Sequence, residues 1–145
     1  MGMSFEFSGL SEMLPDMDEV GIEMAAAAGP ALVESTKKAV KGVVRHDGDS
    51  ELVNSVTMSK PKKGKYGDFI VCAYFKGQSK NKYYRHTKTH RGKYAVSNAL
   101  KAVWKEYGIP SRGIPAQPFI EQATRGAEQE ALEKMQDVFN EKVGS

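Results

Sequence analysis

The sequence has one cysteine, one tryptophan and no long apolar run, and each shortage limits what the protein can be. A single cysteine excludes an internal disulfide and fits a reducing compartment. Cys72 lies in a strand-like run, which favours a buried core thiol over a catalytic one. No apolar run approaches the ~20 residues of a membrane span, so no membrane partner is expected. The acidic beginning also lacks the basic region and the apolar run of a signal peptide.

Residue sets for catalysis, metal binding or phosphate binding are missing as well. No serine, histidine and aspartate stand in the arrangement of a hydrolase triad, and no cysteine is paired with a histidine. Residues 64–67 are too short for a phosphate-binding loop. His86 and His90 are four residues apart, but their basic neighbours disfavour a cation and favour an exposed loop, and His46 lies in a turn. We therefore predict no enzyme activity, no cofactor, no metal ion and no small-molecule substrate.

Charge is distributed very unevenly along the chain. Residues 1–59 hold 4 Lys or Arg and 10 Asp or Glu, residues 60–105 hold 13 and 1, and residues 106–145 hold 4 and 7. The overall charge of +3 therefore hides a basic middle between two acidic ends. Such a pattern predicts either an anionic partner or contacts between copies of the chain.

Tyrosines are interleaved with the basic residues of this middle segment. Basic groups among aromatic rings suit single-stranded nucleic acid or a phosphate backbone. The alternative is a solvated loop that meets the acidic faces of neighbouring copies. The candidate interface or anion-contact residues are Lys62, Lys63, Lys65, Lys82, Arg85, Lys88 and Arg91. Around them lie Lys60, Lys80, Lys93, Tyr66, Tyr83 and Tyr84.

The spacing of apolar residues predicts an α+β fold in one domain over residues 1–145. A small antiparallel β-sheet is packed by a long N-terminal helix, a middle helix and a C-terminal helix. Alternation predicts strands over residues 52–59 and 68–77, joined as an antiparallel hairpin with a basic tip. Apolar residues on both faces of 68–77 predict a central strand that is covered on each side. Residues 81–86 are a candidate third strand.

The N-terminal part is predicted to be a strand followed by a helix. The alternation of apolar and polar residues over 3–10 predicts a short strand that ends at Gly9, and Ser11 is expected to cap the helix. Pro30 is expected to kink or interrupt this helix, because it removes one backbone donor and clashes with the preceding turn. Residues 46–49 then form a turn. The first helical turns hold acids favoured by the helix dipole, namely Asp16, Asp18 and Glu19.

Two further helices are predicted in the C-terminal half. The helical period returns at Lys93, and Trp104 lies beside the apolar stripe, either at the edge of the core or as an exposed anchor. The stripe consists of Val96, Ala99, Leu100, Val103 and Tyr107. The last helix begins near Pro118. Its predicted apolar edge is Leu132, Met135, Phe139 and Val143, and its solvated faces hold Glu128, Glu130, Glu133 and Asp137.

Between these two helices, residues 106–120 form a stiff connector. Its three prolines fix φ at about −65°, and its two glycines supply conformations that other residues tolerate poorly. A segment so constrained is predicted to set the angle at which the last helix meets the rest of the domain. Phe119 is expected to insert into the core directly after the connector.

Four segments carry a resemblance to a known family. Residues 5–14 read FEFSGLSEML, residues 48–56 read GDSELVNSV, residues 106–108 read EYG and residues 115–120 read PAQPFI. In this order they resemble the tail-component family of long-tailed bacteriophages, small neck or tail-completion proteins that act where the head meets the tail. Gln117 stands where that family often has Arg. The matching motif residues are Glu106, Tyr107, Gly108, Pro115, Pro118 and Phe119.

The resemblance implies a structural, non-enzymatic protein of the virion, made in the host cytoplasm and located at the head–tail junction. Its implied partners are copies of itself, in or on a ring, and other junction or tail proteins, with packaged DNA as a further contact of the basic segment. A tail terminator fits the resemblance as well as a neck component does. Ring copy number and head-side or tail-side attachment stay open. The alternative from another class is a small nucleic-acid-binding protein that uses the basic residues 60–93.

Overall fold

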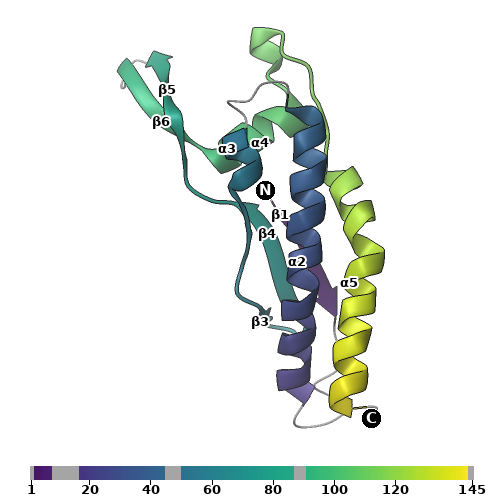
Figure 1. The fold of residues 1–145 in the computed structure, drawn as a ribbon. Helices are drawn as coiled ribbons and strands as arrows, with labels where there is room; N and C mark the ends of the chain where they lie inside the picture. Colours follow the sequence, from purple (N-terminus) through teal and green to yellow (C-terminus); the bar gives the residue numbers. More distant parts are fainter. Residues whose placement is uncertain (1, 8–16, 45–49, 87–90, 144–145) are drawn as a thin grey trace.

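The computed structural model describes residues 2–7, 17–44, 50–86 and 91–143 (Figure 1). In chain order these residues form β1 (Gly2–Phe7), α2 (Met17–Val43), α3 (Ser50–Asn54), β2 (Val56–Met58), β3 (Lys62–Lys63), β4 (Phe69–Phe75), β5 (Gln78–His86), β6 (Arg91–Ser97), α4 (Asn98–Tyr107), the short 3-10 turn η2 (Pro110–Arg112) and α5 (Ile120–Val143). The predicted α+β class is confirmed, because a small antiparallel sheet packs with the long helices α2 and α5 and with the middle helix α4. No helix among the described residues is both long and apolar enough to cross a membrane.

Strand β4 is the centre of the main sheet, as predicted. It pairs antiparallel with β1, β2 and β3. The hairpin of β2 and β4 is therefore confirmed, and the short β3 adds a pairing inside the expected basic tip. Residues 52–55 were wrongly expected to be extended, since they form the end of α3 and a turn. Leu52 and Val56 are both buried and lie four residues apart, a spacing that one helical turn accommodates as well as a strand does.

The side chains on the two faces of β4 differ in how far they are buried. Phe69, Val71, Ala73 and Phe75 are buried in the core that α2 and α5 complete. On the other face, Ile70 and Cys72 are half-buried, and Tyr74 is exposed. The expectations of cover on both faces and of a buried Cys72 thiol are therefore wrong. Helices α2 and α5 lie on the same side of the sheet, which leaves its second face partly open to solvent (Figure 1).

Helix α2 is continuous through Pro30, so of the two predicted outcomes, a kink or an interruption, the interruption is wrong. The side chain of Pro30 is exposed, whereas Ala28, Gly29, Ala31 and Leu32 around it are buried. A proline inside a helix costs about 3 kcal/mol. Packing on both sides of Pro30 holds the helix together across this point, because the buried face makes its contacts before and after the proline.

Helices α2 and α5 lie side by side through small residues (Figure 1). The buried stripe of α5 consists of Ala123, Ala127, Ala131 and Met135. Close approach is visible where Ser35 Oγ donates to the carbonyl oxygen of Ala123 at 2.6 Å. The predicted apolar edge is therefore wrong for Leu132 and Val143, which are 54% and 41% exposed, while burial of Met135 and exposure of the four predicted acids are confirmed. Alanine methyls occupy the interface, and the larger side chains point elsewhere.

The region after β4 departs most from expectation. Residues 78–86 form a strand, but β5 pairs with β6 in a separate two-stranded sheet instead of extending the main one. Residues 93–97 were expected to be helical and belong to β6. Helix α4 begins after Ser97, whose Oγ accepts a hydrogen bond from the backbone N–H of Leu100 at 3.2 Å. Leu100 and Tyr107 of the predicted buried stripe are exposed, and the buried side chains of α4 are Asn98 and Ala102.

Some predictions fall outside the described residues. They are the strand end at Gly9, the cap at Ser11, the position of Asp16, the turn at residues 46–49 with His46, and the placement of Lys88 and His90. Asp18 and Glu19 do lie in the first turn of α2, as predicted.

Candidate functional site

The connector after α4 is a closed turn. The backbone N–H of Gly108 donates to the carbonyl oxygen of Trp104 at 2.8 Å, which ends α4. Ile109 and Ile114 then exchange two backbone hydrogen bonds, of 2.9 and 3.1 Å, across η2. Gly108 has a φ of 73°, and a Cβ on it would lie 2.6 Å from the carbonyl oxygen of Ile114. Only glycine fits this position without strain, because both its backbone angle and its surroundings exclude a side chain.

Glu106 ties the end of α4 to the beginning of α5. Its Oε2 accepts hydrogen bonds from the backbone N–H groups of Phe119 and Ile120, at 2.8 and 3.2 Å. These donors have no partner within the helix, and a carboxylate at a helix N-terminus also interacts favourably with the helix dipole. Nearby, the backbone N–H of Gln117 donates to the carbonyl oxygen of Lys105 at 2.7 Å. Three hydrogen bonds thus join the last turn of α4 to residues 117–120, at and directly before the beginning of α5.

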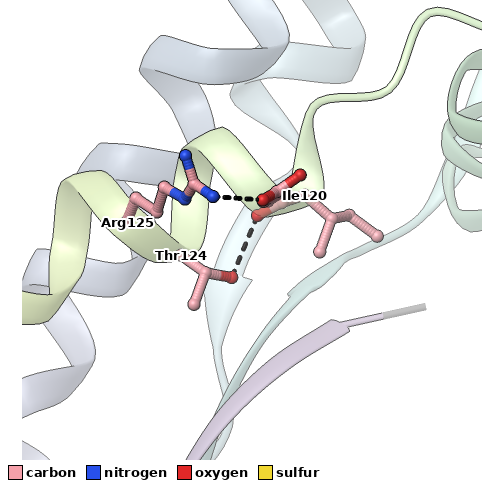
Figure 2. Close-up of polar contacts among 4 residues, drawn as sticks. Ile120, Thr124 and Arg125 are labelled. Carbon is pink, nitrogen blue, oxygen red and sulfur yellow. Dashed lines mark hydrogen bonds and ion pairs between the residues drawn. The ribbon is translucent and has the colours of Figure 1, made fainter.

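The beginning of α5 is anchored in the core as well. Phe119 is 1% exposed, as expected for a side chain inserted after the connector, and its ring meets Phe75 of β4 edge to face at a centroid distance of 6.0 Å. Figure 2 shows the next turn, where Thr124 Oγ1 donates to the carbonyl oxygen of Ile120 at 2.9 Å. Arg125 pairs there with Glu121 at 2.6 Å. The direction of α5 is therefore fixed relative to both α4 and the sheet.

The six motif residues have different places in this arrangement. The structure brings Glu106 and Phe119 together, and it holds Gly108 against the backbone of Ile114 and Pro115. Pro115 and Pro118 are exposed, and the ring of Tyr107 is 67% exposed. The prolines therefore act through their backbone geometry, whereas Tyr107 offers its ring to solvent.

The hairpin of β5 and β6 projects from the body of the molecule (Figure 1), and we call it the arm. Its base is held by hydrogen bonds. Asn98 is 3% exposed and donates from Nδ2 to the carbonyl oxygen of Lys76 at 2.9 Å. The backbone N–H of Lys80 donates to Glu51 Oε1 at 2.8 Å. The arm is therefore joined to α3 and α4 at its root, although an isolated two-stranded hairpin is only marginally stable in water.

The six candidate basic residues that lie within the described part of the chain do not gather in one region. Lys62 and Lys63 lie in β3 beside the beginning of α2, where Lys63 pairs with Asp18 at 2.8 Å, and Lys65 follows in the adjacent turn. Three others lie in the two strands of the arm, namely Lys82, Arg85 and Arg91. Since the arm is rooted near the other end of α2, a helix about 40 Å long separates the two groups (Figure 1). The continuous basic segment of the sequence becomes two separate basic regions.

A groove of about 470 Å³ lies between β6, α4 and the connector. We call it the α4 groove. Apolar side chains line it, among them Leu100, Trp104 and Ile114, and cations stand beside them, namely Lys101, Lys105 and Arg112. Trp104 is half-buried and lines this wall of the groove. The groove could not be predicted from the sequence, because its residues come from four segments, namely α3, β6, α4 and the connector, and share no motif.

The described residues have several features at the surface of the molecule besides the connector. No three His, Cys, Asp or Glu side chains gather among them in a group that could hold a metal ion. What they do provide is a helix of fixed direction, a projecting arm and an apolar groove with a cationic rim.

Comparisons of the chain with models of protein families, with curated proteins and with solved structures found no match. The resemblance to the phage tail-component family therefore rests on the four sequence segments alone.

Proposed function

We propose that this protein is a structural, non-enzymatic component of the head–tail junction of a long-tailed phage, which assembles as a ring or on one. The observation that carries the proposal is the connector. The bonds from Glu106 to the first turn of α5 fix the direction of a 24-residue helix. A closed ring requires every copy to repeat the same rotation, so a rigid relation between two packing elements favours closure.

Two further features support this proposal. The arm extends beyond the body while its root is held by Asn98, so it can reach a neighbouring subunit at a defined angle (Figure 1). The surface also combines basic regions with an acidic helix, and opposite charges on one chain favour contacts between copies. Implied partners are therefore copies of itself and other proteins of the junction or tail.

The proposal is tested by assembly. The purified chain is analysed by light scattering over a wide concentration range, alone and mixed with portal rings and with tail tubes encoded beside its own gene. Rings, or binding to one of these structures, are expected, and the partner that it binds separates a neck component from a tail terminator. A monomer that joins neither structure at any concentration would contradict the proposal.

A second function is favoured by the arm. Its register places Tyr84 opposite Lys93 and His86 opposite Arg91, so basic and aromatic residues alternate along a projecting two-stranded ribbon. Ribbons of this kind can contact the grooves and the phosphates of nucleic acid. The prediction is an affinity for DNA that falls steeply with salt.

A pair of variants tests this second function. Lys82→Glu with Arg85→Glu should abolish DNA binding in a gel-shift experiment. Lys62→Glu with Lys63→Glu should weaken it less, because Lys63 already pairs with Asp18 at 2.8 Å. If the wild-type chain retains no DNA even at low salt, the arm is not a nucleic-acid interface.

A further inference from the structure

Two unpartnered surfaces of opposite character lie far apart on this protein. The first is the α4 groove, where Leu100 and Ile114 are 42% and 46% exposed. Monomeric proteins expose single apolar residues routinely, but a hollow that gathers several of them inside a polar rim marks an interaction site. All charged residues that line this groove within the described part of the chain are cations.

The second surface lies on α5, from Glu128 to Val143 at the end of the helix. Leu132 and Val143 are exposed and eleven residues apart, so they fall on the same side of the helix. Glu128 precedes Leu132 by one turn and Glu133 follows it directly, and both are exposed. We call these four residues the α5 stripe. Around it, residues 128–141 hold five Asp or Glu and one Lys.

The α5 stripe cannot reach the groove of its own chain. The first turn of α5 adjoins the connector, which forms one wall of the groove, while Lys142 near its end pairs with Glu23 in the first part of α2 at 3.3 Å. A helix of 24 residues is about 36 Å long, so the two surfaces lie toward opposite ends of the body (Figure 1). A contact between them has to join two molecules.

We propose that the α4 groove of one copy receives the α5 stripe of the next copy. Apolar side chains meet apolar side chains in the centre, while Lys101 and Arg112 face the acids of the helix at the rim. Since the two surfaces differ, the contact is heterologous and repeats from copy to copy, closing into a ring when the rotation allows it. The inference rests on the self-assembly named in the proposed function and gives it a specific interface.

Charge-swapped variants test the contact. The groove variant carries Lys101→Glu and Arg112→Glu, and the stripe variant carries Glu128→Lys and Glu133→Lys. Each variant alone places like charges opposite each other, which should raise the dissociation constant at least ~10-fold in sedimentation equilibrium. A 1:1 mixture restores opposite charges at every contact, so association should return. A control variant with Lys38→Glu and Lys41→Glu changes the net charge as the groove variant does, at exposed positions of α2 outside the groove, and should associate like wild type.

The outcomes separate this inference from the proposed function. If copies associate and both swapped variants associate equally well, self-assembly holds but the interface lies elsewhere, and the inference is overturned. If both variants fail and their mixture fails too, specific pairing of the two surfaces is refuted. A wild-type chain that stays monomeric to about 1 mM while it binds tail tubes or portal rings overturns the inference and leaves the junction role intact. Circular dichroism of each variant ensures that lost association does not reflect unfolding.

Discussion

The bond from Glu106 to the first turn of α5 is the feature whose removal should be most informative. In Glu106→Ala, the backbone N–H groups of Phe119 and Ile120 lose their acceptor at 2.8 and 3.2 Å. Hydrogen bonds to charged groups contribute about 1.5–3 kcal/mol, and loss of a helix N-cap costs about 0.5–2 kcal/mol. Because Glu106 is only half-buried, water can replace part of the interaction. We expect the free energy of unfolding to fall by about 2 kcal/mol.

Urea denaturation followed by circular dichroism measures this loss of stability. For a domain of this size, a loss of about 2 kcal/mol lowers Tm by about 4–8 °C. Glu106→Gln keeps one oxygen as an acceptor and loses the charge, so its cost should be about 0.5–1 kcal/mol. The matched control is Glu34→Ala, which removes the same charge from an exposed position of α2 outside both proposed contact surfaces and should stay within about 0.5 kcal/mol of wild type.

The difference in destabilisation between Glu106→Ala and this control shows whether the carboxylate of Glu106 holds the beginning of α5. If Glu106→Ala is no more destabilising than Glu34→Ala, the carboxylate does not hold the beginning of α5. The rigid connector would then lose its main support, and the proposal that a fixed direction of α5 serves ring closure would have to be abandoned. A large loss with unchanged ring assembly would refute the link to function and leave the structural role standing.

Other positions give sharp contrasts. Gly108→Ala should lower the free energy of unfolding in urea by at least about 2 kcal/mol, since φ is 73° and the new Cβ would meet the backbone of Ile114. Gly113→Ala should cost about 1 kcal/mol, because φ is 66° but the new Cβ would lie in open space. Gly21→Ala forces a methyl against the buried ring of Phe69 and should lower the free energy of unfolding by about 1–3 kcal/mol, while Gly42→Ala, which meets nothing, should raise it by about 0.5 kcal/mol. Phe119→Ala should cost about 3–5 kcal/mol and lower Tm accordingly.

Much of the fold could be predicted because its signals are local. The alternation of residues 69–75 marks a strand, and the long helical period marks α2 and α5. Errors arose where one pattern fits two structures. Leu52 and Val56 fit a strand or a helical turn, and residues 93–97 carry too few apolar side chains to separate a strand from a helix. Their outcome depends on pairing with distant segments, which periodicity alone does not reveal.

The candidate site also has some features that local sequence predicts and others that depend on contacts between distant segments. Local residue types predicted a stiff connector, since proline and glycine restrict the backbone wherever they occur. The partner of Glu106 could not be predicted in this way, because the carboxylate caps a helix that begins 14 residues later, and no local capping pattern joins them. The α4 groove was invisible for a related reason, since its walls come from segments that only the fold brings together.

The wrong predictions about burial bear on function. Leu100, Tyr107, Leu132 and Val143 lie on predicted apolar stripes and yet are exposed, because Ala102 and the alanines of α5 occupy the core instead. Scattered exposure would need no explanation, since much of any protein surface is apolar. These residues are not scattered. Leu100 belongs to a groove with a cationic rim, and Leu132 belongs to a helix face with acidic neighbours. This arrangement supports the proposed contact between copies, in which the alanines of α5 pack within the molecule and Leu132 packs against the α4 groove of the next copy.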